Sequence, residues 1–132
     1  MPELDHTIVH ATDRIASARF LTDLLALPQP KQLGPFAVVR LGDGAALDYA
    51  EHLVRGRHWT PTHYAIKVTD TEFDAVLTRI RERGLPHWAD PRHTQPDDIN
   101  HLQGGRGVYV NDPDGHNIEF LTVRYTDATL SS

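Results

Sequence analysis

Two histidines and two carboxylates stand out because they recur at matching places in two similar stretches of the chain. His6 and His63 each begin a run of strand-forming residues, and Asp48 and Glu119 each follow an Asp-Gly pair. Imidazole and carboxylate suit divalent iron, manganese, cobalt, nickel or zinc, and two histidines with one carboxylate form the facial arrangement of non-haem iron sites. The pattern predicts one divalent metal ion held by His6, His63 and Glu119, to which Asp48 would add a fourth ligand. The alternative is that both histidines are half-buried strand residues bonded to the backbone.

An internal repeat carries these residues. Residues 5–13 (DHTIVHATD) and 62–70 (THYAIKVTD) share a His, a run of mostly strand-forming residues and a Thr-Asp pair. Residues 43–49 (DGAALDY) and 114–120 (DGHNIEF) share an Asp-Gly pair, two residues, an aliphatic, an acid and an aromatic. An apolar pattern of helical period follows each first block. Each half therefore predicts a strand, a helix and three strands, a βαβββ module.

The expected elements of the first half are at residues 5–11, 14–27, 36–41 and 45–50, with one more strand at either 30–34 or 54–58. Those of the second half are at residues 62–68, 72–83, 86–89, 107–111 and 117–123. Side chains alternate between the two faces of a strand. That alternation places the two histidines and two acids on the faces turned away from the helices.

Local signals mark the helix ends. Asp13 is expected to cap the first helix, and Thr71 with Asp74 forms a candidate capping box for the second. Gly84 is expected to end the second helix. Four other histidines are predicted to be surface or turn residues: His52, His58, His87 and His116.

Composition excludes several classes of protein. Thirteen Lys and Arg against eighteen Asp and Glu give a net charge of −5 with no basic run, which argues against nucleic-acid binding. The apolar stretches are too short to span a bilayer. With no cysteine, disulfides, thiol nucleophiles and Cys-ligated metals are ruled out. The first residues lack the features of a signal peptide, so a cytoplasmic protein is expected.

Three motifs resemble the vicinal oxygen chelate superfamily, which includes glyoxalases, bleomycin-resistance proteins and dioxygenases. They are residues 4–6 (LDH), 62–65 (THYA) and 109–119 (YVNDPDGHNIE). The resemblance implies an α+β fold in which two paired βαβββ modules form a curled sheet around a cleft with a divalent metal. We expect one domain over residues 1–132, with modules at about 3–58 and 60–125. The superfamily's ligand positions fall on His6, His63 and Glu119, and a fourth falls on Asp48, where relatives usually have Glu.

The resemblance also suggests roles for other residues. Ring-cleaving dioxygenases of the superfamily have a Tyr shortly before the Glu ligand, where Tyr109 stands here, but they have an acid–base His where this chain has Asp48. Asp48 is therefore either a fourth ligand or a general base, and Tyr109 is a candidate hydrogen-bond donor to substrate. Strand alternation, and not the resemblance, makes His10 and Lys67 candidate substrate contacts, with exposed strand residues as the alternative. Arg106 is a candidate contact for an anionic substrate, and the alternative is that its glycine-rich segment is only a flexible entry to a strand.

The leading interpretation is a metal-dependent enzyme, either a lyase, an isomerase or an oxygenase, that acts on a small oxygen-chelating substrate. The alternative is a non-catalytic protein that sequesters an antibiotic or another small molecule. We expect a homodimer, because two such modules leave unpaired strand edges. Pairing of the modules within one chain or between chains is left open.

Overall fold

The computed structural model describes residues 1–51 and 59–125, and the chain divides into two compact units. Unit 1 comprises Met1–Pro61 and the short segment Asp112–Gly115. Unit 2 comprises Thr62–Asn111 and His116–Ser132. Each half of the repeat therefore builds its own unit, except that one turn from the second half belongs to unit 1. The single domain expected over the whole chain stays a prediction.

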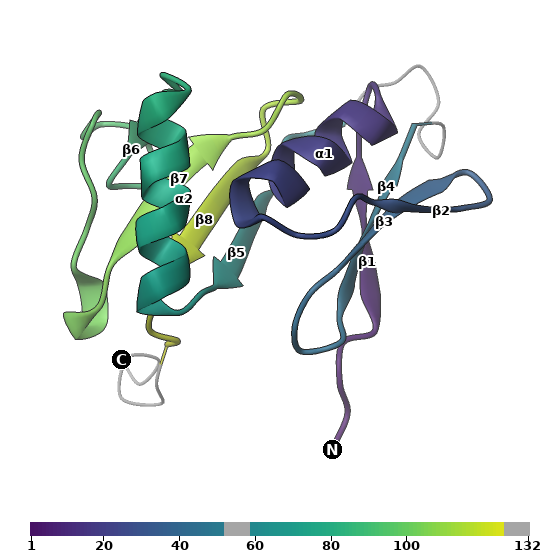
Figure 1. The fold of residues 1–132 in the computed structure, drawn as a ribbon, viewed down its shortest axis with the longest axis horizontal. Coiled ribbons are helices and arrows are strands. Elements are labelled where there is room, and N and C mark those ends of the chain that lie inside the picture. The colour runs from purple at the N-terminus through teal and green to yellow at the C-terminus, as the bar shows by residue number, and fades with distance from the viewer. Residues whose placement is uncertain (52–58, 126–132) are drawn as a thin grey trace. The chain divides into compact units, whose positions relative to one another are not determined.

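Unit 1 contains a four-stranded sheet and one helix (Figure 1). The strand order is β1-β4-β3-β2, with β1 parallel to β4 and the other neighbours antiparallel. The strand that the sequence left open is β2, in the expected range 30–34, and the alternative at 54–58 lies outside the described residues. In chain order the elements are β1 (His6–His10), α1 (Arg14–Leu25), β2 (Lys31–Leu33), β3 (Phe36–Arg40) and β4 (Ala46–Ala50).

Unit 2 repeats this topology. Its strand order is β5-β8-β7-β6, with β5 parallel to β8 and the other neighbours antiparallel. The predicted α+β fold class with two βαβββ modules is confirmed in both units. The elements are β5 (His63–Lys67), α2 (Asp70–Glu82), β6 (His87–Trp88), the short 3-10 helix η2 (Leu102–Gly104), β7 (Gly107–Asn111) and β8 (Asn117–Leu121).

One face of each sheet is apolar and buried. In unit 1, Val9, Val39, Leu47 and Tyr49 occupy this face, and α1 packs against β3 and β4. In unit 2, α2 lies across the sheet (Figure 1) and buries Phe73, Val76, Leu77 and Ile80. The buried strand residues of unit 2 on this face are Ile66, Val108, Val110, Ile118 and Phe120. No helix in the described part of the chain is long and apolar enough to cross a membrane.

Helix α1 begins and ends by local chemistry. The Asp13 carboxylate accepts hydrogen bonds from the backbone N–H groups of Ile15 and Ala16, as the sequence predicts. The helix ends at Leu25, two residues before the expected end, because Ala26 takes a left-handed conformation with φ of 54°.

Helix α2 begins two residues earlier than expected. Its capping box joins Thr69 to Glu72: each side chain accepts a hydrogen bond from the other residue's backbone N–H. The predicted box between Thr71 and Asp74 is therefore wrong. Gly84 follows the helix with a positive φ of 61°, which confirms the expected stop.

The turn Asp112–Gly115 anchors the start of α1. Gly115 N–H donates to the Asp112 carbonyl at 3.0 Å, which closes the turn. The Asp114 carboxylate accepts from the Thr12 backbone N–H at 3.0 Å, the Thr12 hydroxyl at 2.6 Å and the Ser17 hydroxyl at 2.8 Å. A negative charge at this position also favours the N-terminal end of the helix dipole.

We predict that Asp114→Ala lowers the free energy of unfolding by about 2 kcal/mol, because hydrogen bonds to a charged group contribute more than neutral ones. The measurement is urea denaturation followed by circular dichroism. Asp23→Ala, on the exposed side of α1, is the matched control and should change stability by less than about 0.5 kcal/mol. Equal effects of the two substitutions would contradict an anchoring role for Asp114.

Candidate functional site

Unit 1 contributes His6 and Asp48 from neighbouring parallel strands. The pairing of β1 with β4 puts Ile8 opposite Asp48, so His6 lies two residues before that partner. Because residues two apart share a face, both side chains belong to the sheet face opposite α1. The predicted common face is therefore confirmed for this pair.

Asp5 holds the imidazole of His6 through one ring nitrogen. Asp5 Oδ2 lies 2.7 Å from His6 Nδ1. This hydrogen bond, and after it the negative charge of Asp48, raises the pKa of His6. A carboxylate on one ring nitrogen orients the other nitrogen for a metal, as is usual behind histidine ligands. Nε2 is therefore the ring nitrogen of His6 that is available to bind a metal. Sequence reasoning assigned Asp5 no role, although an acid directly before a candidate ligand histidine is a usable signal.

Asp48 is a largely buried carboxylate among apolar neighbours. The residue is 8% exposed, and its register partners on either side are Ile8 and Val38. No described residue donates a hydrogen bond to its side chain. A buried carboxylate is costly unless it is compensated, and a bound divalent cation would compensate it.

His63 and Glu119 meet directly in unit 2. His63 Nε2 lies 2.8 Å from Glu119 Oε1. Glu119 is 3% exposed, whereas the His63 side chain is 43% exposed. Ala65 pairs with Glu119, so the histidine again lies two residues before the partner of the acid, as in unit 1. The structure thus brings two predicted ligands together through atoms that can bind a metal.

Tyr109 completes the group of polar side chains in unit 2. It is the register partner of Glu119 on β7, and its hydroxyl donates to that carboxylate. Its ring meets the His63 ring edge-on, with the centroids 5.5 Å apart. Burial, and after it the charge and hydrogen bond of Glu119, raises the pKa of Tyr109 strongly. The hydroxyl therefore keeps its proton and serves as a donor at neutral pH.

The candidate ligands are divided two and two between the units. Within the described residues of either unit, no three His, Asp or Glu side chains form a group that could hold a metal. Convergence of His6, His63 and Glu119 on one ion therefore stays a prediction. The side chains themselves fit a divalent cation, since each unit offers an imidazole close to a buried carboxylate.

The predicted substrate contacts His10 and Lys67 lie at the ends of their strands. The ring of His10, on β1, stacks on Trp59 with the centroids 5.8 Å apart. Lys67 is exposed at the end of β5, on the same face as His63. Both roles remain predictions.

Arg106 has protein partners of its own. Its guanidinium bonds Asp74 Oδ1 at 2.6 Å and Asp70 Oδ1 at 3.1 Å, and it lies 4.6 Å above the Phe73 ring. These contacts hold it at the start of α2. A substrate contact by Arg106 stays a prediction.

Two histidines differ from the expectation of exposed or turn positions. His116 directly follows the turn but is fully buried, and its Nδ1 accepts from the Thr62 backbone N–H at 2.9 Å. His87, on β6, is 7% exposed, so the prediction is wrong for this residue. His52 and His58 lie outside the described residues.

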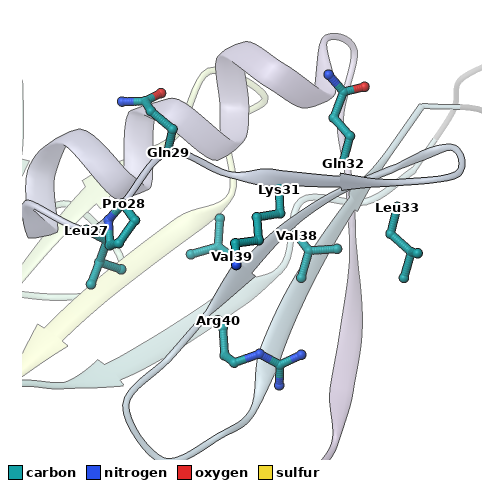
Figure 2. Close-up of a pocket in the computed structure, with 9 residues that line it drawn as sticks. All are labelled: Leu27, Pro28, Gln29, Lys31, Gln32, Leu33, Val38, Val39 and Arg40. Carbon is teal, nitrogen blue, oxygen red and sulfur yellow. The ribbon is translucent and has the colours of Figure 1, made fainter.

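A pocket of about 450 Å³ lies beside β2 and β3 in unit 1 (Figure 2). Val38 pairs with Asp48 on one side and with Lys31 on the other, so these three residues form one row across the sheet. Val38 is therefore the lining residue that lies next to Asp48 in this row. Its lining includes Leu27, Pro28, Lys31, Leu33, Val38 and Arg40.

Comparisons with known proteins find relatives with this fold, although no protein-family model matches the chain. The structure of oxidase ChaP-H1 is 55% identical, covers 95% of this chain and 98% of its own, and superposes with a TM-score of 0.88. A glyoxalase/bleomycin resistance protein from Catenulispora acidiphila is 27% identical, covers 92% of this chain and all of its own, and gives a TM-score of 0.63. Among curated sequences, glutathione transferase FosA of Serratia marcescens is 25% identical over 90% of this chain and 79% of its own.

The raised pKa of Tyr109 predicts a loss of stability at alkaline pH. Between the ordinary tyrosine pKa of about 10 and the raised value, the unfolded chain releases this proton while the folded protein retains it. The free energy of unfolding therefore falls as pH rises above about 10. Tyr109→Phe should flatten this fall in urea denaturation measured at several pH values. Tyr125→Phe, at a more exposed site, is the control, and equal slopes in both variants would contradict the assignment.

Proposed function

We propose that this chain, which belongs to the vicinal oxygen chelate superfamily, is a metal-dependent oxidase of a small substrate with two neighbouring oxygens. One observation carries the proposal, namely the 55% identity to oxidase ChaP-H1 over nearly the whole of both chains. The glutathione transferase is less similar, so it is weaker support for a particular reaction. Metal dependence is supported by the paired imidazoles and buried carboxylates.

In the proposed enzyme, His6, His63 and Glu119 hold the metal. When bound, the divalent ion supplies Lewis-acid and redox chemistry to the two substrate oxygens. Asp5 orients His6 through Nδ1, which keeps Nε2 directed at the site. The hydrogen bond from Tyr109 holds the Glu119 carboxylate in one orientation.

Asp48 is the proposed general base. It is one methylene shorter than the Glu that relatives usually have, so its carboxylate would stop short of a bound ion and would accept a substrate proton. Its apolar neighbours Ile8 and Val38 limit access of water to that carboxylate. Tyr109 retains its proton, and its one hydroxyl hydrogen, which bonds Glu119 in the absence of substrate, would turn to a substrate oxygen when substrate binds.

The pocket in unit 1 favours an apolar, flat substrate. Leu33 and Val38 provide an apolar wall, while Lys31 and Arg40 provide positive charge for phenolic or carboxylate oxygens (Figure 2). Its volume of about 450 Å³ is within the range of small-molecule sites. An aromatic diol, with its two oxygens near Asp48 and its rings along β3, has this chemistry.

Oxygen uptake tests the proposal. The protein is loaded with iron(II) or manganese(II) and mixed with aromatic vicinal diols, from catechol to 1,2-dihydroxynaphthalene, in an oxygen electrode cell. We expect uptake that needs both protein and metal. In this reaction the diol loses two electrons and two protons to dioxygen, giving a quinone and hydrogen peroxide. The ring should stay intact, because Asp48 stands where ring-cleaving relatives have an acid–base His.

Uptake equal to that of the free metal ion would contradict the oxidase proposal. Tight binding of a diol without any oxygen uptake would instead favour the alternative of a sequestering protein. A chelator should abolish turnover, and the same metal added back should restore it.

We predict that Asp48→Asn and Glu119→Gln have different effects on the metal. Asp48→Asn should retain most of the bound metal and lose about 10²–10⁴-fold in turnover, the usual contribution of a general base. Glu119→Gln should lose both, because it removes a charged ligand. Metal content by elemental analysis and oxygen uptake are measured on both variants. Equal metal loss would make Asp48 an ordinary fourth ligand, and full occupancy in both would contradict the metal site.

We further propose that the chain forms a homodimer. Strand β2 pairs only with β3 among the described strands, and its three residues are exposed, with Leu33 67% exposed. Such an open edge favours a partner. Sedimentation equilibrium at micromolar concentration should give twice the chain mass of 14.8 kDa, and a species of 14.8 kDa would contradict the dimer.

A further inference from the structure

A long connection distinguishes unit 2 from unit 1. In unit 1, residues 34–35 alone join β2 to β3, whereas in unit 2 residues 89–106 join β6 to β7. β6 is the edge strand of its sheet (Figure 1). Because unit 1 builds the same topology with the short connection, the fold itself does not require the long one. Connections of this length in compact domains usually have a functional role.

This connection places His93 on the sheet face that carries the candidate metal ligands. Asn117 lies two residues before Glu119 on β8, so both side chains share that face. The Asn117 amide bonds the connection twice: Nδ2 donates to the Pro91 carbonyl at 3.1 Å, and Oδ1 lies 3.0 Å from His93 Nε2. Because a carbonyl oxygen only accepts hydrogen bonds, Nδ2 is the donor there, and Oδ1 therefore accepts from His93 Nε2.

Asn117 lies close to both candidate ligands of unit 2. It is the register partner of His63 across β8 and β5, and neighbouring strands lie about 4.8 Å apart. Glu119 follows two residues later, about 6.6 Å along the strand. The amide that holds His93 is therefore next to both residues, and the His93 ring lies at the Asn117 side of the His63–Glu119 pair.

The His93 ring is fixed by an aromatic stack as well as by its hydrogen bond. It lies parallel to the Trp88 indole, with the centroids 3.7 Å apart and the planes 3° apart. Trp88 is the register partner of Tyr109, which in turn pairs with Glu119, so the stack belongs to the same face. The ring is partly buried between these contacts.

The backbone at His93 is strained, and a local turn maintains the strain. Its φ of 61° is in the left-handed region, which is unfavourable for a residue with a side chain. The Asp90 carboxylate accepts from the Thr94 N–H at 2.8 Å, the Thr94 hydroxyl at 2.7 Å and the Gln95 N–H at 2.9 Å. Strained residues persist only where their surroundings hold them, and they cluster at functional sites. His93 is therefore a fixed obstacle on this face.

We propose that His93 determines substrate specificity by closing the Asn117 side of the proposed metal site to bulky groups. The inference rests on the proposed function, in which a metal at His63 and Glu119 positions the diol. A diol with one bulky group beside its oxygens can turn that group away from His93, but a diol with bulky groups on both sides cannot. Displacing the ring loses the bond to Asn117 and the stack on Trp88, which together weaken binding about 25-fold.

Two catechols test this proposal, namely 3-tert-butylcatechol and 3,6-di-tert-butylcatechol. The full-length protein is loaded with zinc(II), which has no redox chemistry, and excess zinc is removed. Binding of each catechol is then measured by calorimetry without oxygen, so that no turnover occurs. We expect the wild type to bind the singly substituted catechol about 25-fold more tightly, because only the doubly substituted one must displace His93.

Variants separate the ring from the rest of the connection. His93→Gly removes the ring and tolerates the positive φ, so it should fold and bind both catechols within about 3-fold of each other. His93→Phe keeps the stack on Trp88 and should retain a preference of about 5-fold. His101→Gly, at an exposed histidine of the same connection, is the matched control and should show the wild-type preference.

The outcomes distinguish this inference from the proposed function. Equal, zinc-dependent affinity of the wild type for both catechols would overturn the role of His93 and leave the metal site standing. An unchanged preference in His93→Gly would overturn it as well, since the obstacle would then lie elsewhere. Binding that does not depend on zinc would contradict the proposed function and this inference with it.

Discussion

The buried charge of Glu119 is the constraint on which the site in unit 2 depends. A carboxylate that is 3% exposed needs compensation, and it has two partners, His63 Nε2 at 2.8 Å and the Tyr109 hydroxyl. The partners come from β5 and β7, the two strands that flank β8. Strand pairing therefore sets the site geometry, because a one-residue shift of either neighbour would turn its side chain to the other face.

Unit 1 has the same strand topology, but its buried carboxylate has different neighbours. Asp48 occupies the place of Glu119, and Val38 occupies the place of Tyr109 as its register partner. Asp48 consequently has no hydroxyl donor across the strand, and its influence on His6 is through charge. One carboxylate has hydrogen-bond partners on the neighbouring strands and the other does not, which is consistent with the proposed roles of Glu119 as a ligand and Asp48 as a proton acceptor.

The repeat made most of the fold predictable from sequence. Side chains alternate between the two faces of a strand, and each of the four candidate residues lies on the face that this alternation predicts. The capping box of α2 is a place where the sequence pattern did not identify the correct residues. Residues 69–74 (TDTEFD) contain two Thr-x-x-acid patterns, Thr69 with Glu72 and Thr71 with Asp74. The structure uses the first, in which the longer Glu side chain reaches back to the capping N–H.

Contacts between distant residues were beyond the reach of sequence patterns. Arg106 bonds Asp74, 32 residues away, and nothing local distinguishes that use from a substrate contact. Asp5 was missed for another reason: its place directly before His6 is a usable signal, but the sequence reasoning gave it no role, and the structure shows that its carboxylate meets Nδ1. Sequence thus predicts which face a side chain takes, and tertiary structure decides its partner.

Strand β6 illustrates how much depends on such tertiary contacts. It is two residues long, and its neighbouring residues serve different faces: Trp88 joins the row of Tyr109 and Glu119, while His87 joins the row of Val110. A strand of two residues is too short for its sequence pattern to determine its register. The returning loop supplies the missing constraint, because the Asp97 N–H bonds the His87 carbonyl and thereby fixes which of the two residues turns toward α2. A slip of one residue would bury the indole in place of the imidazole and would alter both faces of unit 2 together.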